Sequence, residues 1–309
     1  MEINGTWIDD TFAEAFGMRF TRVDITAHDE YWLDAALNEV TGYGSSVIGC
    51  DAEVGVELKL AEGQTLDGRP GASVLFFGFS ADALAEAVRS RVGQCVMTCP
   101  TTAVFNGLFD TEASMPLGKH LRFFGDGFQK SKRLGGRRFW RIPVMDGEFI
   151  VEDRIGVGKG VAGGNFIIQG PAIELVLTAA RRATSALEDS AKLITPFPGG
   201  IARSGSKVGS QYPDLIASTA DGFCPTLKGR VQSKLHPDAN YAVEIVIDGC
   251  HENAVADGLR QAIHAACVEG ISAISAGNYG GKLGKYSYGL HTLLQPADES
   301  QRESDSNMN

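Results

Sequence analysis

Cysteines, long apolar runs and targeting signals are scarce or missing in this sequence, and each scarcity excludes a class of protein. The six cysteines are scattered, and although Cys95 and Cys99 lie close together, no His or second Cys pair completes a metal-ligand set. We therefore expect free thiols and no metal site. No apolar run reaches the roughly 20 residues of a membrane helix. The start, MEINGTWIDD, has no basic and apolar signal pattern, so we expect a cytoplasmic protein without membrane contact.

Positive charge is also scarce. The 28 Lys and Arg residues face 38 Asp and Glu residues, a formal net charge of −10. A general nucleic-acid binder presents a basic face, so no nucleic-acid partner is expected. The densest basic run is either a local patch for an acidic ligand or a solvated turn; it comprises Lys130, Lys132, Arg133, Arg137 and Arg138.

Strand and helix patterns alternate along the 309 residues in the same order twice. Apolar alternation and helical spacing predict strand–helix–strand–strand–helix–strand in each half, which is the ferredoxin-like order. In the first half the strands are expected at 20–26, 46–49, 53–58 and 73–79, with helices at 29–40 and at 81–92, the latter capped by Ser80. In the second half the strands are expected at 164–169, 193–201, 241–248 and 271–275, with helices at 171–187 and 251–267.

The fold class that follows is α+β, with two similar ferredoxin-like α/β lobes whose antiparallel sheets carry helices on one face. We place the N-terminal lobe at residues 1–147 and the C-terminal lobe at 148–294. Residues 295–309 are polar and are expected to form a disordered tail.

Two glycine motifs resemble nucleotide-binding loops but lack the required context. Residues 158–163 match GxGxxG, yet a strand and not a helix follows them, so a flexible hinge or a tight turn between the lobes is expected there. Residues 200–207 resemble a P-loop, but Ser206 stands where the phosphate-binding Lys is required. No GxSxG elbow precedes a helix, which argues against a Ser–His–Asp hydrolase.

Three features are candidates for a functional site. Two glycine-rich stretches, 196–209 and 275–286, would let backbone N–H groups approach a ligand, although ordinary loops use glycine in the same way. Glu244 lies within the apolar strand sequence VEIVI. If it is buried, its pKa rises and it can donate a proton near neutral pH. Alternation places it on one face with Asp248, so a solvated strand face is the alternative.

Long blocks of the sequence resemble the formylmethanofuran:tetrahydromethanopterin formyltransferase family. They are MEINGTWIDDTFAEAF, GQCVMTCPTTAVF, FFGDGF, GVAGGNF, ITPFPGGIARSGSKVGS, YAVEIVIDG and ISAGNYGGKLGKY. These blocks extend over residues 1–294, in the order in which the family has them.

The resemblance implies formyl transfer between formylmethanofuran, or a methanofuran analogue, and tetrahydromethanopterin, both as substrates and without a prosthetic group. It further implies a homo-oligomer, a dimer or a tetramer, and in bacteria a place beside formyl-hydrolase subunits. A non-catalytic structural subunit of such a complex is the alternative.

The same resemblance implies which residues form the site. The family has a buried active-site Glu at the position of Glu244, which is therefore the expected catalytic residue. The family's glycine-rich blocks imply a substrate-binding role for Pro198, Gly199, Gly200, Ser206, Lys207, Asn278, Tyr279, Gly280, Gly281 and Lys282.

Overall fold

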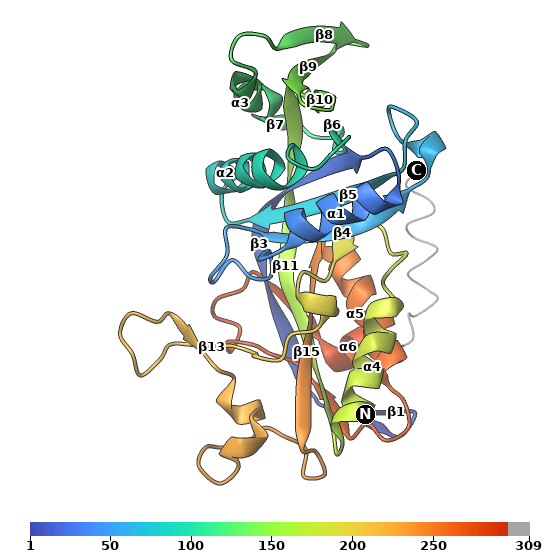
Figure 1. The fold of residues 1–309 in the computed structure, drawn as a ribbon. Coiled ribbons are helices and arrows are strands. Elements are labelled where there is room, and N and C mark those ends of the chain that lie inside the picture. Colours follow the sequence, from blue (N-terminus) through green and yellow to red (C-terminus); the bar gives the residue numbers. More distant parts are fainter. Residues whose placement is uncertain (296–309) are drawn as a thin grey trace, which may run out of the picture.

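The computed structural model describes residues 1–295 (Figure 1). Apart from Gln295, the tail expected at 295–309 lies outside the described residues. Among the described residues, no helix is both long and apolar enough to cross a membrane.

The first lobe is a ferredoxin-like sheet with two helices. Its elements are β3 (Phe12–Thr26), α1 (Glu30–Thr41), β4 (Glu53–Leu60), β5 (Gly71–Gly78), α2 (Ala81–Arg91) and β6 (Ala103–Asn106). The strands pair in the order β6-β3-β5-β4, with all three pairs antiparallel. Asp29 and Ser80 cap the two helices by accepting from Trp32 N and Ala83 N, each at 3.1 Å. The expected cap at Ser80 is therefore confirmed.

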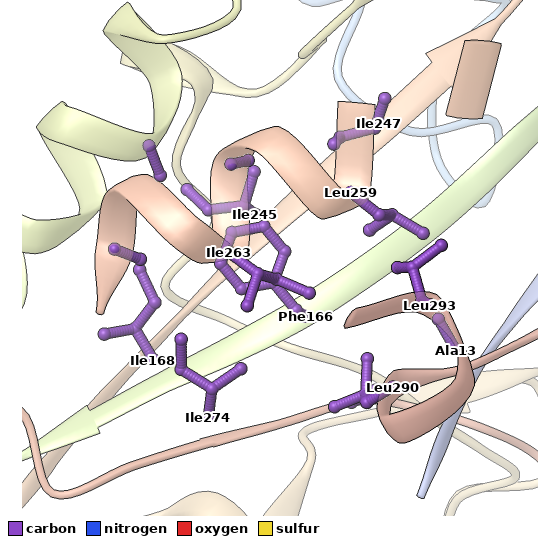
Figure 2. Close-up of a cluster of buried hydrophobic side chains, with 14 of the residues drawn as sticks. Ala13, Phe166, Ile168, Ile245, Ile247, Leu259, Ile263, Ile274, Leu290 and Leu293 are labelled. Carbon is purple, nitrogen blue, oxygen red and sulfur yellow. The ribbon is translucent and has the colours of Figure 1, made fainter. Parts of the chain in front are cut away.

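The second lobe repeats this order. Its elements are β11 (Arg154–Gly170), α4 (Ile173–Ser185), β12 (Leu193–Ile194), β15 (Tyr241–Gly249), α5 (Glu252–Ala266) and β16 (Ala273–Ser275). The strands pair in the order β16-β11-β15-β12, again antiparallel. Apolar residues of β11, β15 and α5 interlock in the core shown in Figure 2, among them Phe166, Ile245 and Ile263. The expected α+β fold of two ferredoxin-like lobes is confirmed.

Shorter elements extend the lobes. Between β6 and β11 lie β7 (Ala113–Pro116), α3 (Gly118–Leu121), β8 (Lys130–Leu134), β9 (Arg137–Val144) and β10 (Gly147–Glu152). The chain begins with β1 (Glu2–Ile3) and β2 (Thr6–Ile8), and the described part ends with β17 (Tyr286–Gly289) and α6 (Leu290–Leu294). The long connection between β12 and β15 contains β13 (Lys207–Val208) and β14 (Ala217–Ser218), and Figure 1 shows it projecting to one side.

Three local expectations are wrong. Residues 46–49 form turns and not a strand, and the strand expected at 193–201 ends at Ile194, before the glycines of a 3-10 turn at Pro198–Gly200. The glycines at 158–163 form neither hinge nor turn, because they lie inside the 17-residue strand β11. They are needed there for packing, since a Cβ on Gly158 would lie 2.4 Å from the Phe20 ring.

The two lobes are joined through their longest strands. Residues Gly158–Ala162 of β11 pair with Phe20–Phe16 of β3, so the sheets are continuous. The start of the chain also forms part of the second lobe. Its strand β2 pairs with β16, and Ile8, Ala13 and Ala15 lie in the core of the second lobe. The proposed division at residue 147 stays a prediction, and much of residues 1–15 packs against the second lobe.

Candidate active site

A pocket of about 660 Å³ lies where the two lobes meet. The first lobe contributes side chains of β3, the start of β4, Phe79 and the turn segment 45–50. The second lobe contributes β11, β15, the two glycine-rich stretches and the arm around β14. Much of the lining is apolar, and it includes Phe16, Met18, Phe79, Phe197, Val208, Ile216, Val246 and Leu283.

Glu244 presents its carboxyl to this pocket from the middle of β15. Its backbone is fixed on both sides, by pairing with Ile167 of β11 and by two 2.8 Å hydrogen bonds with Ala202. Both glycine-rich stretches approach its carboxyl. A Cβ on Gly205 would lie 3.8 Å from Oε2, and one on Gly277 would lie 3.6 Å from Oε1. Glycine at these two positions leaves open space directly beside the carboxyl.

The environment of Glu244 favours its protonated form. The side chain is half-buried, and within residues 1–295 its carboxyl has no hydrogen-bond partner. Burial raises the pKa of Glu244 to about 7, because no donor or cation stabilises the charged form. The carboxyl is therefore present in both its protonated and its ionised form near pH 7 and can exchange a proton with a ligand in the pocket.

Asn165 fixes the start of the second glycine-rich stretch. Its Oδ1 accepts from Gly277 N at 2.6 Å, and its Nδ2 donates to Gly277 O at 3.1 Å. The residue lies on β11 next to a bulge at Gly163, whose O accepts from the same Nδ2. Asn165 thereby sets the position of Gly277 beside Glu244.

Glu14 holds the rest of that stretch. Its Oε2 accepts from the backbone N–H groups of Tyr279 and Gly281, at 2.8 and 2.9 Å, and its Oε1 accepts from those of Leu283 and Gly284, at 2.7 and 2.5 Å. Burial alone would raise the pKa of Glu14, but these four donors outweigh burial and lower it. Glu14 is thus a buried carboxylate that shapes a loop and keeps its charge.

The structure brings some of the expected binding residues together and leaves others outside the pocket. Glu244, Ser206, Lys207 and Tyr279 line it. Among the other expected residues, Asn278 donates to Thr11 Oγ1 and Phe12 O and thereby ties the loop to β3. The remaining ones, which support the turns without lining the pocket, are Pro198, Gly199, Gly200, Gly280, Gly281 and Lys282.

The pocket offers little positive charge. Within the described part of the chain, Lys207 is the one Lys or Arg that lines it, and it forms an ion pair with Asp221. The basic run lies elsewhere, on β8 and β9, which Figure 1 shows at the end of the first lobe far from β15. Arg137 of that run pairs with the buried Glu152 at 2.5 Å. The pocket therefore suits an uncharged part of a ligand.

Sequence reasoning missed Glu14, Asn165 and the turn segment 45–50. The first two lie in the sequence blocks FAEAF and GVAGGNF, so a polar residue inside an apolar strand was the available signal. The 45–50 segment gave no signal, because strand pairing across the lobes brings it to the pocket. Across residues 1–295, no group of three or more His, Cys, Asp or Glu side chains is arranged as a metal site.

Comparison with known proteins matches both lobes of the chain. Residues 1–144 match the family model of formylmethanofuran-tetrahydromethanopterin formyltransferase, and residues 147–293 match the model of its proximal lobe. A formylmethanofuran–tetrahydromethanopterin formyltransferase of Methylococcus capsulatus is 50% identical over 298 residues, which cover 95% of this chain and all of the relative.

Two solved structures have the same fold. The formylmethanofuran:tetrahydromethanopterin formyltransferase of Methanosarcina barkeri superposes with a TM-score of 0.90 at 45% identity, covering 95% of this chain and all of that one. A chain of the formyltransferase/hydrolase complex of Methylorubrum extorquens, solved with methylofuran, gives a TM-score of 0.92 at 45% identity, covering 96% and 99% of the two chains.

Proposed function

The chain belongs to the formylmethanofuran–tetrahydromethanopterin formyltransferase family, and on that premise we propose that the pocket between the lobes is its site of formyl transfer. The protein is a formyltransferase that moves a formyl group between formylmethanofuran, or a methanofuran analogue, and tetrahydromethanopterin. The observation that carries the assignment of the site is the open Glu244 carboxyl, whose pKa burial raises to about 7.

The proposed reaction is a direct acyl transfer between two amines. The attacking amine forms a C–N bond to the formyl carbon, and the C=O electrons move to oxygen to give a tetrahedral intermediate. When the old C–N bond breaks, Glu244 gives its proton to the departing nitrogen. The proton that the attacking amine loses returns to the Glu244 carboxylate, so atoms and charge balance over one turnover.

The surroundings of Glu244 suit this chemistry. Holding both substrates in one pocket supplies much of the rate acceleration without a covalent enzyme intermediate. We propose for that reason that no prosthetic group takes part and that both carriers are substrates. The apolar lining limits water around the formyl group, which keeps Glu244 protonated and strengthens its hydrogen bonds.

The alternative of a non-catalytic subunit fits the site less well. A structural role would leave no reason for an unpartnered carboxyl between two glycines that keep it accessible. We infer that the chain is catalytic, whether it works in a homo-oligomer or beside hydrolase partners, as the Methylorubrum extorquens relative does in its complex. A transfer assay on the isolated chain with both carriers distinguishes the two roles.

Glu244→Gln tests the assignment of Glu244. The amide keeps the shape but cannot transfer a proton, so we expect kcat to fall by roughly 10²–10⁴. KM should change much less, because the lost interaction belongs to the transition state. In the wild type, the rate should decline above pH 7, since the acid form is lost as the pH rises through a pKa of about 7. The variant should lack this decline.

The exposed Glu269→Gln serves as the matched control and should behave as wild type. A circular-dichroism melt of each variant establishes that it is folded. Near-normal turnover of a folded Glu244→Gln variant would show that Glu244 is not the proton donor.

A further inference from the structure

Two further carboxyls, those of Glu53 and Asp248, lie close to the same pocket, and Glu53 is part of its lining. Glu53 is the first residue of β4, in the first lobe, and Asp248 lies near the end of β15, in the second. They are 6% and 0% exposed. Glu53 Oε1 accepts from Val47 N at 3.1 Å, and Asp248 Oδ1 accepts from Gly163 N at 2.9 Å. The two side chains contact each other across the junction of the lobes.

One oxygen of each carboxyl is left without a donor. Within residues 1–295, Glu53 Oε2 and Asp248 Oδ2 are buried and have no hydrogen-bond partner. Two ionised carboxylates in contact would repel each other, whereas one proton between them makes a charge-assisted O–H···O⁻ hydrogen bond. Burial raises the pKa of both groups, and the adjacent Glu53 raises that of Asp248 further.

No other charged group replaces that proton. Within the described residues, neither carboxyl forms a hydrogen bond or an ion pair with any other titratable side chain. Arg22 of β3 is bound to Glu57 of β4 at 2.5 Å. The other titratable side chains on the pocket lining are Glu14, Cys50, Lys207, Glu244 and Tyr279. Lys192, Cys250 and His251 lie beside the ends of β12 and β15, next to Asp248.

We propose that Glu53 and Asp248 share one proton and act as a positioning pair, which joins the two lobes and holds two walls of the substrate pocket. One wall is the turn segment 45–50, held by Glu53 through Val47 N. The other is the bulge at Gly163, held by Asp248. This inference rests on the proposed function only in taking the pocket as the substrate site.

The bulge at Gly163 connects the Glu53–Asp248 pair to Glu244, the proposed proton donor. Gly163 has a φ of +85° and begins the bulge that leads to Asn165. Asn165 fixes Gly277, which lies beside the carboxyl of Glu244. If the Glu53–Asp248 contact is lost, the turn segment 45–50 and the bulge at Gly163 are no longer held in position relative to each other. Substrate binding should then weaken before the chemical step does.

Amide substitutions test whether one proton is shared. In Glu53→Gln or in Asp248→Asn, the new N–H₂ donates to the remaining carboxylate and replaces the shared proton. In the double variant, each amide oxygen accepts from Val47 or Gly163, so two N–H₂ groups face each other. We expect the double variant to lose more in melting temperature than the two single losses together. A loss in melting temperature that equals the sum of the two single losses, or is smaller, would overturn the proposal that the pair shares one proton.

The pH dependence of KM tests the positioning role. As the pH rises through the raised pKa of the pair, the wild-type pair loses its proton, the two carboxylates repel each other, and KM should rise. Asp248→Asn cannot lose a proton, so this alkaline rise should be absent, while the decline of kcat that belongs to Glu244 remains. Asp248→Leu should raise KM on the order of tenfold, as loss of a buried hydrogen bond predicts, and Asp248→Asn should restore it. An alkaline rise in KM unchanged in Asp248→Asn would overturn the proposal.

The two sets of measurements separate this inference from the proposed function. Melting temperatures are measured without substrate. They therefore test whether the pair shares a proton even if the wild type transfers no formyl group. If the wild type is active and the double variant shows no excess loss, the inference fails and the function stands.

Discussion

At the scale of single residues, one pocket contains carboxyls with opposite pKa shifts. Glu14 is ionised because four backbone N–H groups surround it, whereas Glu244 lacks any such donor and its pKa rises to about 7. The same residue type is therefore stabilised as an anion in one position and has its protonated form favoured in another. Local donors, not the burial that both share, decide which form is stable.

Glu14→Gln should weaken the loop that carries Tyr279 and Leu283. The amide nitrogen of Gln cannot accept a hydrogen bond, so two backbone N–H groups that Glu14 satisfies lose their partner. We expect the free energy of unfolding to fall by about 1–3 kcal/mol and KM to rise, as measured by urea denaturation and steady-state kinetics. The exposed Glu112→Gln is the control. A variant as stable as this control would show that the four hydrogen bonds do not hold the loop.

The same group predicts an acid limit. The pKa of Glu14 is lower in the folded protein than in the unfolded chain. Its contribution to stability is therefore present above the unfolded value of about 4.3 and is lost as the pH falls through the folded pKa. Glu14→Gln should lack this part of the acid destabilisation.

Only part of this pocket could be predicted from the sequence, and the reason is physical. The resemblance placed Glu244, but the residues alone left a solvated strand face open, because alternation cannot show what covers a face. Gly205 and Gly277 approach this face beside the carboxyl, and both come from segments outside β15 that alternation cannot place there. The Glu53–Asp248 contact was equally hidden, since it forms between two lobes.

At the scale of elements, β11 shows why a glycine pattern misled the sequence reading. Glycines in GVGKGVAGGNF are typical of a hinge, but three of them allow close packing within a strand. A Cβ on Gly158 would lie 2.4 Å from Phe20 Cε1, one on Gly160 would lie 2.9 Å from Phe77, and one on Gly164 would lie 2.4 Å from Val255. The packing partners belong to β3, β5 and α5, so sequence periodicity could not reveal them.

Gly158→Ala tests that account. The added methyl overlaps the ring of Phe20, which is 5% exposed and has little room to move. Overpacking of this kind typically costs about 1–3 kcal/mol, and we expect that loss in the free energy of unfolding from urea denaturation. Gly63→Ala is the matched control, because nothing lies within 4 Å of its added Cβ. A hinge role would instead leave stability near that of the control.

At the scale of the whole molecule, the order of elements was predictable and the joining of the lobes was not. Each lobe follows local patterns of apolar spacing and helix caps, so most of the ferredoxin-like order could be read from the sequence, although β6, the last strand of the first lobe, was not among the expected strands. The joining depends on pairing between distant segments, β3 with β11 and β2 with β16. Figure 1 shows β3 and β11 side by side in the middle of the molecule, where they pair.

This joining predicts that the second lobe does not fold alone. A fragment of residues 148–294 lacks β2, which pairs with β16, and the first residues of β3, which pair with β17. It also lacks Ile8, Ala13 and Ala15, which are 0% exposed in the core that Figure 2 shows in part. An unfilled core and unpaired strand edges destabilise a fold. We expect no cooperative circular-dichroism melt for 148–294 alone, and recovery of one when residues 1–147 are expressed with it. A fragment of 148–294 that melts cooperatively by itself would show that the lobe boundary at residue 147 is also a folding boundary, and that the crossing segments stabilise the second lobe without being required for it.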